Sequence, residues 1–260
     1  LHDALPISMT SNHEPLTSPQ ADTPWQPMYY PDCPNPDKVA LLRAGAQVRR
    51  RLEADPNACK VPVETAEIWS IADFVSDEEC TRLMAEVDRT AKPSDLLDQG
   101  YGLESTHRTS YSGDFNSDDP FVRMIERRID DTLGLPHENG ETIQGQRYDP
   151  GQEFRAHMDW FWTKAPYWKR EAQRGGQRCF TAMLYLNDVA EGGETHFHNI
   201  GVTIAPQKRA LIVWNNAKVD GSLNQDTIHA GRPVIRGTKY IITKWYRVRR
   251  WGPPVPGSRR

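Results

Sequence analysis

The chain of 260 residues is 37% hydrophobic and 26% charged, which suffices for one sizeable core and one domain with flanking segments. Its formal net charge of -3, with both signs interspersed, argues against a nucleic-acid partner, and its apolar runs stay below the roughly 20 residues of a membrane span. The four cysteines form no CxxC pair and are too sparse for a zinc knuckle or a dense disulfide framework, so we expect reduced thiols in a cytoplasmic protein.

The first part of the chain, residues 1–35, is rich in Pro, Ser, Thr and Asp and has few periodic apolar positions. Such a composition does not offset the entropy of ordering, so this segment is expected to be disordered. The first methionine is Met9, and residues 1–8 are not expected to contribute to the fold. Spaced apolar side chains over residues 37–54 predict an amphipathic helix. The region 36–62 is therefore expected to be an accessory helix and a linker.

A strand and two helices are predicted next. Residues 66–71 form a strand-like apolar run. Ser76 is followed three residues later by Glu79, which predicts a capping box and a helix that runs to about Thr90. The apolar pattern of residues 121–133 predicts another helix, entered at a proline and closed by a glycine.

The pattern changes from residue 141 onward, where short runs rich in β-branched and aromatic residues alternate with Gly, Pro, Asn and Asp turns. We therefore predict an α+β fold with a double-stranded β-helix (jelly roll) core over about residues 141–250, flanked by N-terminal helices, within a domain of residues 63–250. Proline and glycine in residues 251–260 predict a loose tail. The strand-like runs are residues 180–186, 202–204, 210–214 and 240–246.

His157 and Asp159 lie two residues apart, so on a strand both side chains would project from the same face. His229 follows 70 residues after Asp159, a separation that a jelly roll can close. Two imidazoles and one carboxylate form the facial triad of non-haem iron, which leaves coordination positions open for a co-substrate and oxygen. A structural zinc site would instead fill all of its positions, often with thiolates. We therefore predict that His157, Asp159 and His229 bind iron(II).

Lys239 lies ten residues after His229, between β-branched and aromatic neighbours, so we expect it to be partly buried. A buried ammonium needs an anion. The distal carboxylate of 2-oxoglutarate would supply that anion, while the other end of the molecule chelates the iron. The alternative from the residues alone is a lysine at a strand edge in water.

The order HxD, distant histidine, then lysine ten residues later resembles the prolyl 4-hydroxylase family of the Fe(II)/2-oxoglutarate-dependent dioxygenases. By this resemblance Tyr148 and Thr195 hydrogen-bond the co-substrate, whereas Arg178 and Trp245 line the peptide groove. The residue types alone are also consistent with a purely structural role, in which Tyr148, Thr195 and Trp245 are buried in the sheet. The resemblance covers roughly residues 68–247 and includes DFVSDEEC (73–80), RTS (108–110), YDPG (148–151), GGQR (175–178), YLNDV (185–189), EGGET (191–195) and KWY (244–246).

The resemblance implies an enzyme that hydroxylates proline in a peptide or protein and converts 2-oxoglutarate to succinate, with iron(II), oxygen and, as a reductant, ascorbate. Two alternatives remain open. One is the same chemistry on a free amino acid or small metabolite, and the other is a jelly-roll binding protein that has kept the fold without the reaction. A nucleic-acid demethylase would need a strongly basic groove, which the net charge does not favour.

Two features depart from the family pattern. His196 and His198 alternate on one strand, where the family commonly has a proline at the second position, and they suggest a second metal site without an evident third ligand. Residues 160–168 are unusually aromatic and basic for a loop beside an active site. Loops of that kind are often substrate lids, so this segment leaves the exact substrate open.

Overall fold

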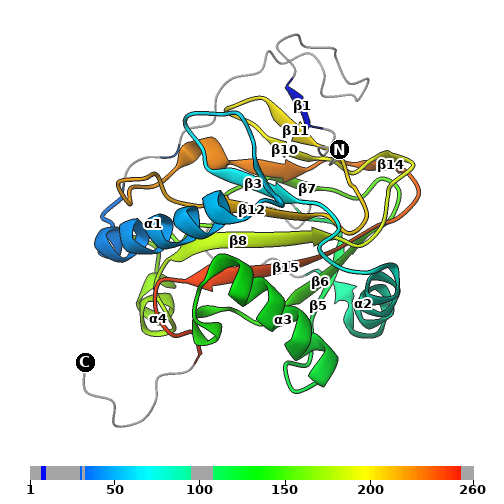
Figure 1. Cartoon of the computed structure of the whole chain (residues 1–260), viewed down its shortest axis with the longest axis horizontal. Helices are drawn as coiled ribbons and strands as arrows, with labels where there is room; N and C mark the ends of the chain where they lie inside the picture. The colour runs from blue at the N-terminus through cyan, green and yellow to red at the C-terminus, as the bar shows by residue number, and fades with distance from the viewer. Residues whose placement is uncertain (1–6, 10–29, 31–32, 95–107, 253–260) are drawn as a thin grey trace.

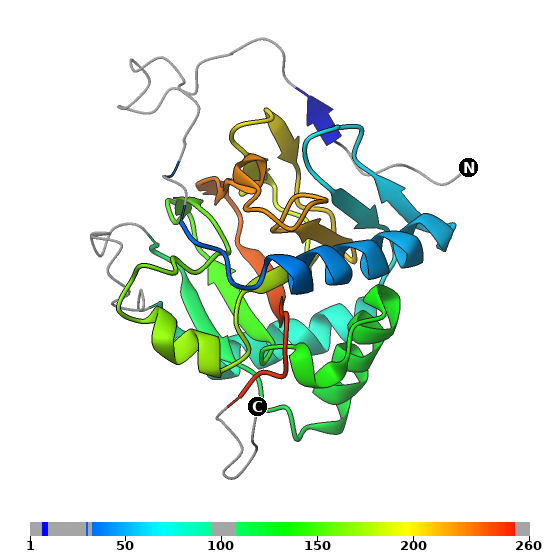
Figure 2. The same ribbon diagram turned by 90° about the vertical axis from the view of Figure 1, so that its left-hand side faces the viewer.

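The computed structural model describes residues 7–9, 30, 33–94 and 108–252. Two antiparallel sheets pack face to face, and three longer helices cover the outer face of the larger sheet (Figure 1). Seen from the side, the same helices gather on one side of the molecule and the smaller sheet lies on the other (Figure 2). This is the predicted α+β arrangement of a jelly-roll core with flanking helices.

The larger sheet consists of β2 (Ala58–Lys60), β3 (Ile68–Ile71), β4 (Lys92–Pro93), β5 (Tyr111–Asp114), β6 (Gln144–Tyr148), β8 (Arg178–Tyr185), β12 (Leu211–Asn215) and β15 (Lys239–Arg247). Its strand order is β2-β3-β12-β8-β15-β6-β5-β4, so strands far apart in the sequence lie side by side. The longest strand, β15, runs between β8 and β6 and pairs antiparallel with both. Residues from three distant segments therefore share the centre of this sheet.

The smaller sheet consists of β1 (Ile7–Met9), β7 (Phe154–His157), β10 (Thr195–Phe197), β11 (Val202–Ile204) and β13 (His229–Gly231). Its strand order is β1-β11-β10-β13-β7. Two short strands, β9 (Glu191–Gly192) and β14 (Val234–Arg236), pair separately. The pairing of β13 with β7 brings together the two segments in which the sequence predicted metal ligands.

The helices are α1 (Lys38–Ala54), α2 (Asp77–Thr90), α3 (Pro120–Leu133) and α4 (Trp168–Gln173), with single 3-10 turns at His137–Asn139 and Gln225–Thr227. The predicted capping box is present at the start of α2, where the Ser76 hydroxyl accepts the Glu79 N–H and the Glu79 carboxylate accepts the Ser76 N–H. Helix α3 begins with Pro120 and ends at Gly134, whose φ of 66° is the left-handed conformation that glycine adopts without strain. These local signals explain why the predicted helix ends were accurate.

Alternation along the central strands divides the buried side chains into two cores. On β12, Leu211 and Val213 pack toward the helices, whereas Ile212 and Trp214 pack between the sheets. The helical core includes apolar side chains from α1, α2 and α3. Between the sheets, polar side chains lie beside the apolar ones, and there the strands leave a pocket.

Most of the predicted disordered segment, residues 1–35, and residues 253–260 of the predicted tail lie outside the described residues. Within the first segment, Ile7–Met9 forms β1 and pairs with β11, which differs from the expected disorder. The Tyr30 N–H donates to the Gln225 side chain at 2.6 Å, and the Tyr30 carbonyl accepts from the same side chain at 3.1 Å. The described part of the chain contains no helix with the length and apolar character to cross a membrane, and its four cysteines are free.

Candidate active site

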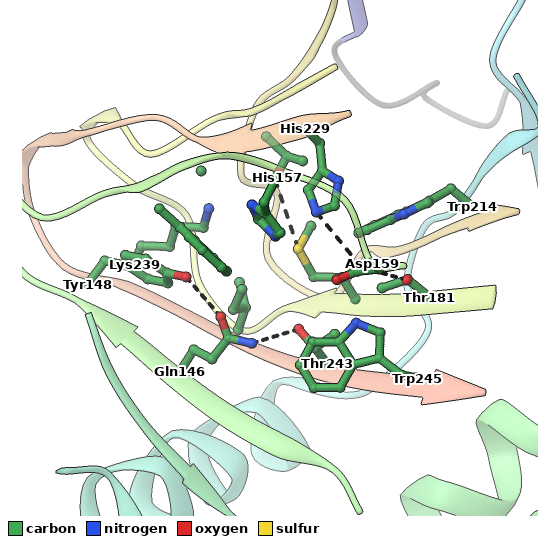
Figure 3. Close-up of a pocket in the computed structure, with 15 residues that line it drawn as sticks. Gln146, Tyr148, His157, Asp159, Thr181, Trp214, His229, Lys239, Thr243 and Trp245 are labelled. Atoms are coloured by element: carbon green, nitrogen blue, oxygen red, sulfur yellow. Dashed lines mark hydrogen bonds and ion pairs between the residues drawn. The ribbon is translucent and has the colours of Figure 1, made fainter. Parts of the chain in front are cut away.

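A pocket lies between the two sheets, over the centre of the larger one (Figure 3). Alternate residues of β6, β8 and β15 form one wall, and β7, β10 and β13 contribute the opposite wall. Of the eight predicted site residues, all except Arg178 line this pocket. The lining residues are Gln146, Tyr148, Phe154, His157, Asp159, Thr181, Met183, Thr195, Trp214, His229, Gly231, Lys239, Ile241, Thr243 and Trp245.

The two predicted histidine ligands lie side by side because β13 pairs with β7. The register places His229 opposite His157, with ring centroids 4.3 Å apart. The Nδ1 of His157 lies 2.9 Å from the Arg155 carbonyl, and the Nδ1 of His229 lies 2.9 Å from the Thr227 carbonyl. Since a carbonyl only accepts, each Nδ1 carries a proton, which leaves Nε2 as the atom of each ring that can bind a metal.

Asp159 completes the group without lying on the strand of His157. Strand β7 ends at His157, and Asp159 follows two residues later, so the predicted shared strand face was wrong. The chain turns there and directs the carboxylate toward His229, whose Nε2 lies 3.9 Å from Asp159 Oδ2 (Figure 3). One potential ligand atom from each of the three residues lies within 4.8 Å of the others. The three side chains can therefore converge on one ion.

The Asp159 carboxylate is held in its ionised form. Burial by itself would raise the pKa of this carboxyl, which is 5% exposed. The neighbouring His229, His157 and Arg178 outweigh burial, and a 2.7 Å hydrogen bond from Thr181 adds to their effect, so the pKa lies below its ordinary value. An ionised carboxylate with two imidazole nitrogens is a donor set that suits iron(II) and leaves positions for other ligands. Among the described residues, no other cluster of three metal-binding side chains is present.

Lys239 is more deeply buried than the sequence predicted. It is the first residue of β15 and is only 2% exposed. Its Nζ lies 5.3 Å from the Tyr148 ring centroid and 5.5 Å from that of Tyr185, and no described carboxylate forms an ion pair with it. Burial lowers its pKa to about 7, which Glu194 offsets only in part. A buried ammonium without an ion-pair partner would be stabilised by the carboxylate of a bound ligand.

Tyr148 and Thr195 place their hydroxyls in the pocket near Lys239. Tyr148 is the last residue of β6, directly opposite Lys239 in the strand register. Its hydroxyl donates to Gln146 at 2.8 Å. The Thr195 hydroxyl accepts from Tyr185 at 2.6 Å, and Tyr185 also borders Lys239. Both predicted co-substrate residues are therefore at the end of the pocket that carries the buried ammonium.

The two predicted substrate residues, Arg178 and Trp245, are stacked on each other. The Arg178 guanidinium lies 4.2 Å from a Trp245 ring centroid and forms hydrogen bonds of 2.7 and 2.8 Å with Glu141. Its Nη1 is 3.8 Å from Asp159 Oδ1. The buried indole N–H of Trp245 has no acceptor among the described residues. Trp245 thus offers the pocket both an apolar ring and a hydrogen-bond donor, while Arg178 supports that ring.

The histidine pair outside the pocket does not gain a third ligand. The ring centroids of His196 and His198 are 5.0 Å apart, and His196 Nδ1 lies 2.9 Å from the Thr203 hydroxyl. Burial, followed by the nearby Arg232 cation, lowers the pKa of His196 to about 3. A guanidinium beside two neutral imidazoles disfavours a bound cation. The described residues therefore do not support the second metal site.

The aromatic segment after Asp159 is a loop that leads into α4 and contains two buried side chains. Trp160 and Phe161 are buried, and Trp168 begins α4. Residues 160–167 belong to no helix or strand, and within them Trp162 packs against Tyr30 with ring centroids 5.0 Å apart. The predicted loop is therefore confirmed for residues 160–167, although two of its aromatic side chains are core positions, and its role as a substrate lid stays a prediction.

Sequence reasoning missed several pocket residues, among them Gln146, Thr181, Trp214 and Thr243. Side chains two apart share a face of a strand, so counting from Lys239 reaches Thr243 and then Trp245. The same count backward from Tyr148 reaches Gln146. Thr181 and Trp214 have no such signal, because the strand register that joins them forms only in the folded sheet.

Comparisons with known proteins agree with this site. Residues 143–247 match the family model of the 2OG-Fe(II) oxygenase superfamily. Prolyl 4-hydroxylase 2 of Arabidopsis thaliana is 34% identical over 241 residues, which cover 81% of this chain and 79% of that protein. Probable prolyl 4-hydroxylase 8 of the same plant is 35% identical over 198 residues, or 67% of this chain. The chain spans 66% of the length of this second relative.

Two solved structures share the fold. The viral collagen prolyl hydroxylase of Paramecium Bursaria Chlorella virus-1, in its 2OG complex, matches with a TM-score of 0.53 and 29% identity over 69% of this chain and 94% of its own. A Trichoplax adhaerens prolyl hydroxylase, in complex with a hypoxia inducible factor peptide fragment, matches with a TM-score of 0.51 and 16% identity over 81% of this chain and 95% of its own. Together with the sequence relatives, the first of these structures shows that the chain belongs to the prolyl 4-hydroxylase family of the 2OG-Fe(II) oxygenase superfamily.

Proposed function

We propose that the chain hydroxylates proline in a peptide or protein and couples this reaction to the conversion of 2-oxoglutarate to succinate. One observation carries the proposal. His157, Asp159 and His229 converge in a pocket that also contains the buried ammonium of Lys239, which no described carboxylate pairs (Figure 3). A molecule that chelates a metal at one end and has a carboxylate at the other suits both groups, and 2-oxoglutarate is such a molecule.

Each end of the pocket has its own task. Bound iron(II) and 2-oxoglutarate would supply oxygen activation, in which 2-oxoglutarate loses carbon dioxide and one oxygen atom enters a C–H bond. His157, Asp159 and His229 would hold the iron. Lys239 would form a charge-assisted bond with the distal carboxylate, and the Thr195 hydroxyl, which lines the same pocket, would donate another.

The side chains around the metal group would position the substrate and exclude water. Trp214 is 1% exposed and packs edge-on against His229, with ring centroids 4.8 Å apart. Trp245 presents its ring and its unpaired indole N–H to the same pocket. A proline ring has apolar faces, and the peptide around it has carbonyl acceptors, so both parts find a partner in Trp245. The relatives' names, prolyl 4-hydroxylases, support the same substrate class.

Mass spectrometry of proline-containing peptide libraries tests this proposal. Libraries are incubated with the enzyme, iron(II), 2-oxoglutarate and oxygen, and each product is examined for one added oxygen atom on proline. The Asp159→Ala variant is the matched control and should give no hydroxylated peptide. Hydroxylation of free amino acids in place of peptides would support the small-molecule alternative, and the absence of any succinate would support a binding protein.

Ascorbate as the reductant and the cytoplasm as the site of action are further parts of the proposal. Their support is the family's chemistry and the sequence composition. If added ascorbate does not increase the number of turnovers per enzyme molecule, ascorbate is not the reductant. If cell fractionation finds the protein outside the cytoplasmic fraction, the proposed location is wrong.

A further inference from the structure

A glutamine side chain lines the pocket between Tyr148 and Thr243. Gln146 is on β6, two residues before Tyr148, so both side chains face the pocket. Gln146 is 4% exposed, and its amide is therefore shielded from water by the two sheets. The proposed mechanism assigns this amide no task.

The amide joins two hydroxyls into one chain of hydrogen bonds. The Tyr148 hydroxyl donates to Gln146 Oε1 at 2.8 Å, and Gln146 Nε2 donates to the Thr243 hydroxyl at 3.0 Å (Figure 3). A phenol has a single proton to donate. While that proton is engaged by Gln146, the Tyr148 hydroxyl offers other partners only a lone pair.

An arriving carboxylate needs the same proton. Tyr148 lies directly opposite Lys239 in the strand register, and the Lys239 Nζ is 5.3 Å from the Tyr148 ring centroid. A carboxylate at Lys239 would therefore lie near the Tyr148 hydroxyl, but a carboxylate accepts and does not donate. The hydroxyl must leave Gln146 before it can donate to the ligand.

We infer that Gln146 sets the affinity of the pocket for 2-oxoglutarate by competing with its distal carboxylate for the Tyr148 hydroxyl. This inference rests on the proposed function, because it takes 2-oxoglutarate as the ligand of Lys239. The exchange replaces a neutral hydrogen bond with a charge-assisted one, which is stronger, so binding still proceeds. The net binding free energy of 2-oxoglutarate is nevertheless smaller than it would be without Gln146, because the hydrogen bond from Tyr148 to Gln146 is lost.

Gln146→Met removes the competing acceptor and keeps a side chain of similar length. The Tyr148 hydroxyl then has no acceptor until the ligand arrives, so the dissociation constant of 2-oxoglutarate should fall about fivefold, the equivalent of one neutral hydrogen bond. Calorimetric titration of the anaerobic, iron(II)-loaded protein measures this constant without turnover. Gln144→Met is the matched control, since Gln144 lies on the same strand outside the pocket lining, and it should leave the constant unchanged.

The Tyr148→Phe variant tests whether Gln146 competes for the Tyr148 hydroxyl or has only a structural role. In Tyr148→Phe there is no hydroxyl to compete for, so adding Gln146→Met should no longer tighten binding. The inference would be overturned if Gln146→Met tightened 2-oxoglutarate binding equally in the wild type and in Tyr148→Phe. It would also be overturned if Gln146→Met alone left this binding unchanged or weakened it. If Gln146→Met does not fold, Gln146→Leu replaces it in the same cycle. A wild-type protein that binds no 2-oxoglutarate would instead contradict the proposed function.

Discussion

Thr181 donates a 2.7 Å hydrogen bond to Asp159 Oδ2, and the Asn216 side-chain amide donates to Thr181 at 3.1 Å. All three side chains are at most 5% exposed. Asp159 lies beyond the end of β7, so no strand pairing holds its carboxylate. Thr181, on the central strand β8 of the opposite sheet, supplies that support instead.

Thr181→Val should therefore weaken iron(II) binding about 10- to 100-fold, the usual effect of losing a residue that orients a metal ligand. Thr181→Ser keeps the hydroxyl and should bind iron nearly as the wild type does. Anaerobic iron(II) titration gives both constants. Wild-type affinity in Thr181→Val would show that the Asp159 carboxylate needs no such support.

Replacement of each proposed iron ligand by alanine should abolish turnover. His157→Ala, Asp159→Ala and His229→Ala each leave two ligands, so succinate formation from 2-oxoglutarate should disappear while the circular dichroism spectrum stays that of the wild type. Saturating iron(II) should stabilise the wild type by about 2.7 kcal/mol at 100 times its dissociation constant, and the variants hardly at all. Continued succinate formation in all three variants would exclude this group as the metal site.

Binding of 2-oxoglutarate should depend on pH through Lys239. Burial lowers the pKa of Lys239 to about 7, so the free pocket has a charged lysine below that pH and a neutral one above it. The ligand needs the charged form, and its dissociation constant should be flat below pH 7 and rise up to about tenfold per unit above it. Titration calorimetry at several pH values should show this rise, together with proton uptake on binding.

Lys239→Ala tests the same contact directly. A hydrogen bond to a charged group contributes about 1.5–3 kcal/mol, so the variant should bind 2-oxoglutarate at least about tenfold more weakly and lose the pH dependence above neutrality. Iron(II) affinity should stay at the wild-type value, because no iron ligand is altered. An unchanged 2-oxoglutarate affinity would mean that another basic residue holds the co-substrate.

Trp245→Ala should separate substrate use from co-substrate turnover. Trp245 stacks on Arg178 and faces the pocket, and its substitution removes both the ring and the indole N–H donor. Peptide hydroxylation should fall much further than substrate-free conversion of 2-oxoglutarate to succinate, and proline-rich peptides should be hydroxylated whereas free proline is not. Efficient hydroxylation of free proline, together with unchanged peptide turnover in the variant, would favour the small-molecule alternative.

Local signals in the sequence were enough to predict much of the framework. The capping box at Ser76 and the glycine after Leu133 depend on neighbours within one helical turn, so α2 and α3 could be placed accurately. Runs such as residues 202–204 have β-branched side chains at successive positions, and the structure has β11 there. The spacing of His157, Asp159, His229 and Lys239 along the chain was enough to indicate the family.

Long-range register decided what the sequence could not. Asp159 was expected on a strand, and the burial of the loop residues Trp160 and Phe161 was not predicted, because periodicity does not show where pairing ends or which loop side chains the fold covers. The hydrogen bonds from Thr181 to Asp159 and from Gln146 to Thr243 join residues 22 and 97 positions apart. Such contacts exist only after β8, β6 and β15 have paired, since pairing fixes which side chains of distant strands face each other.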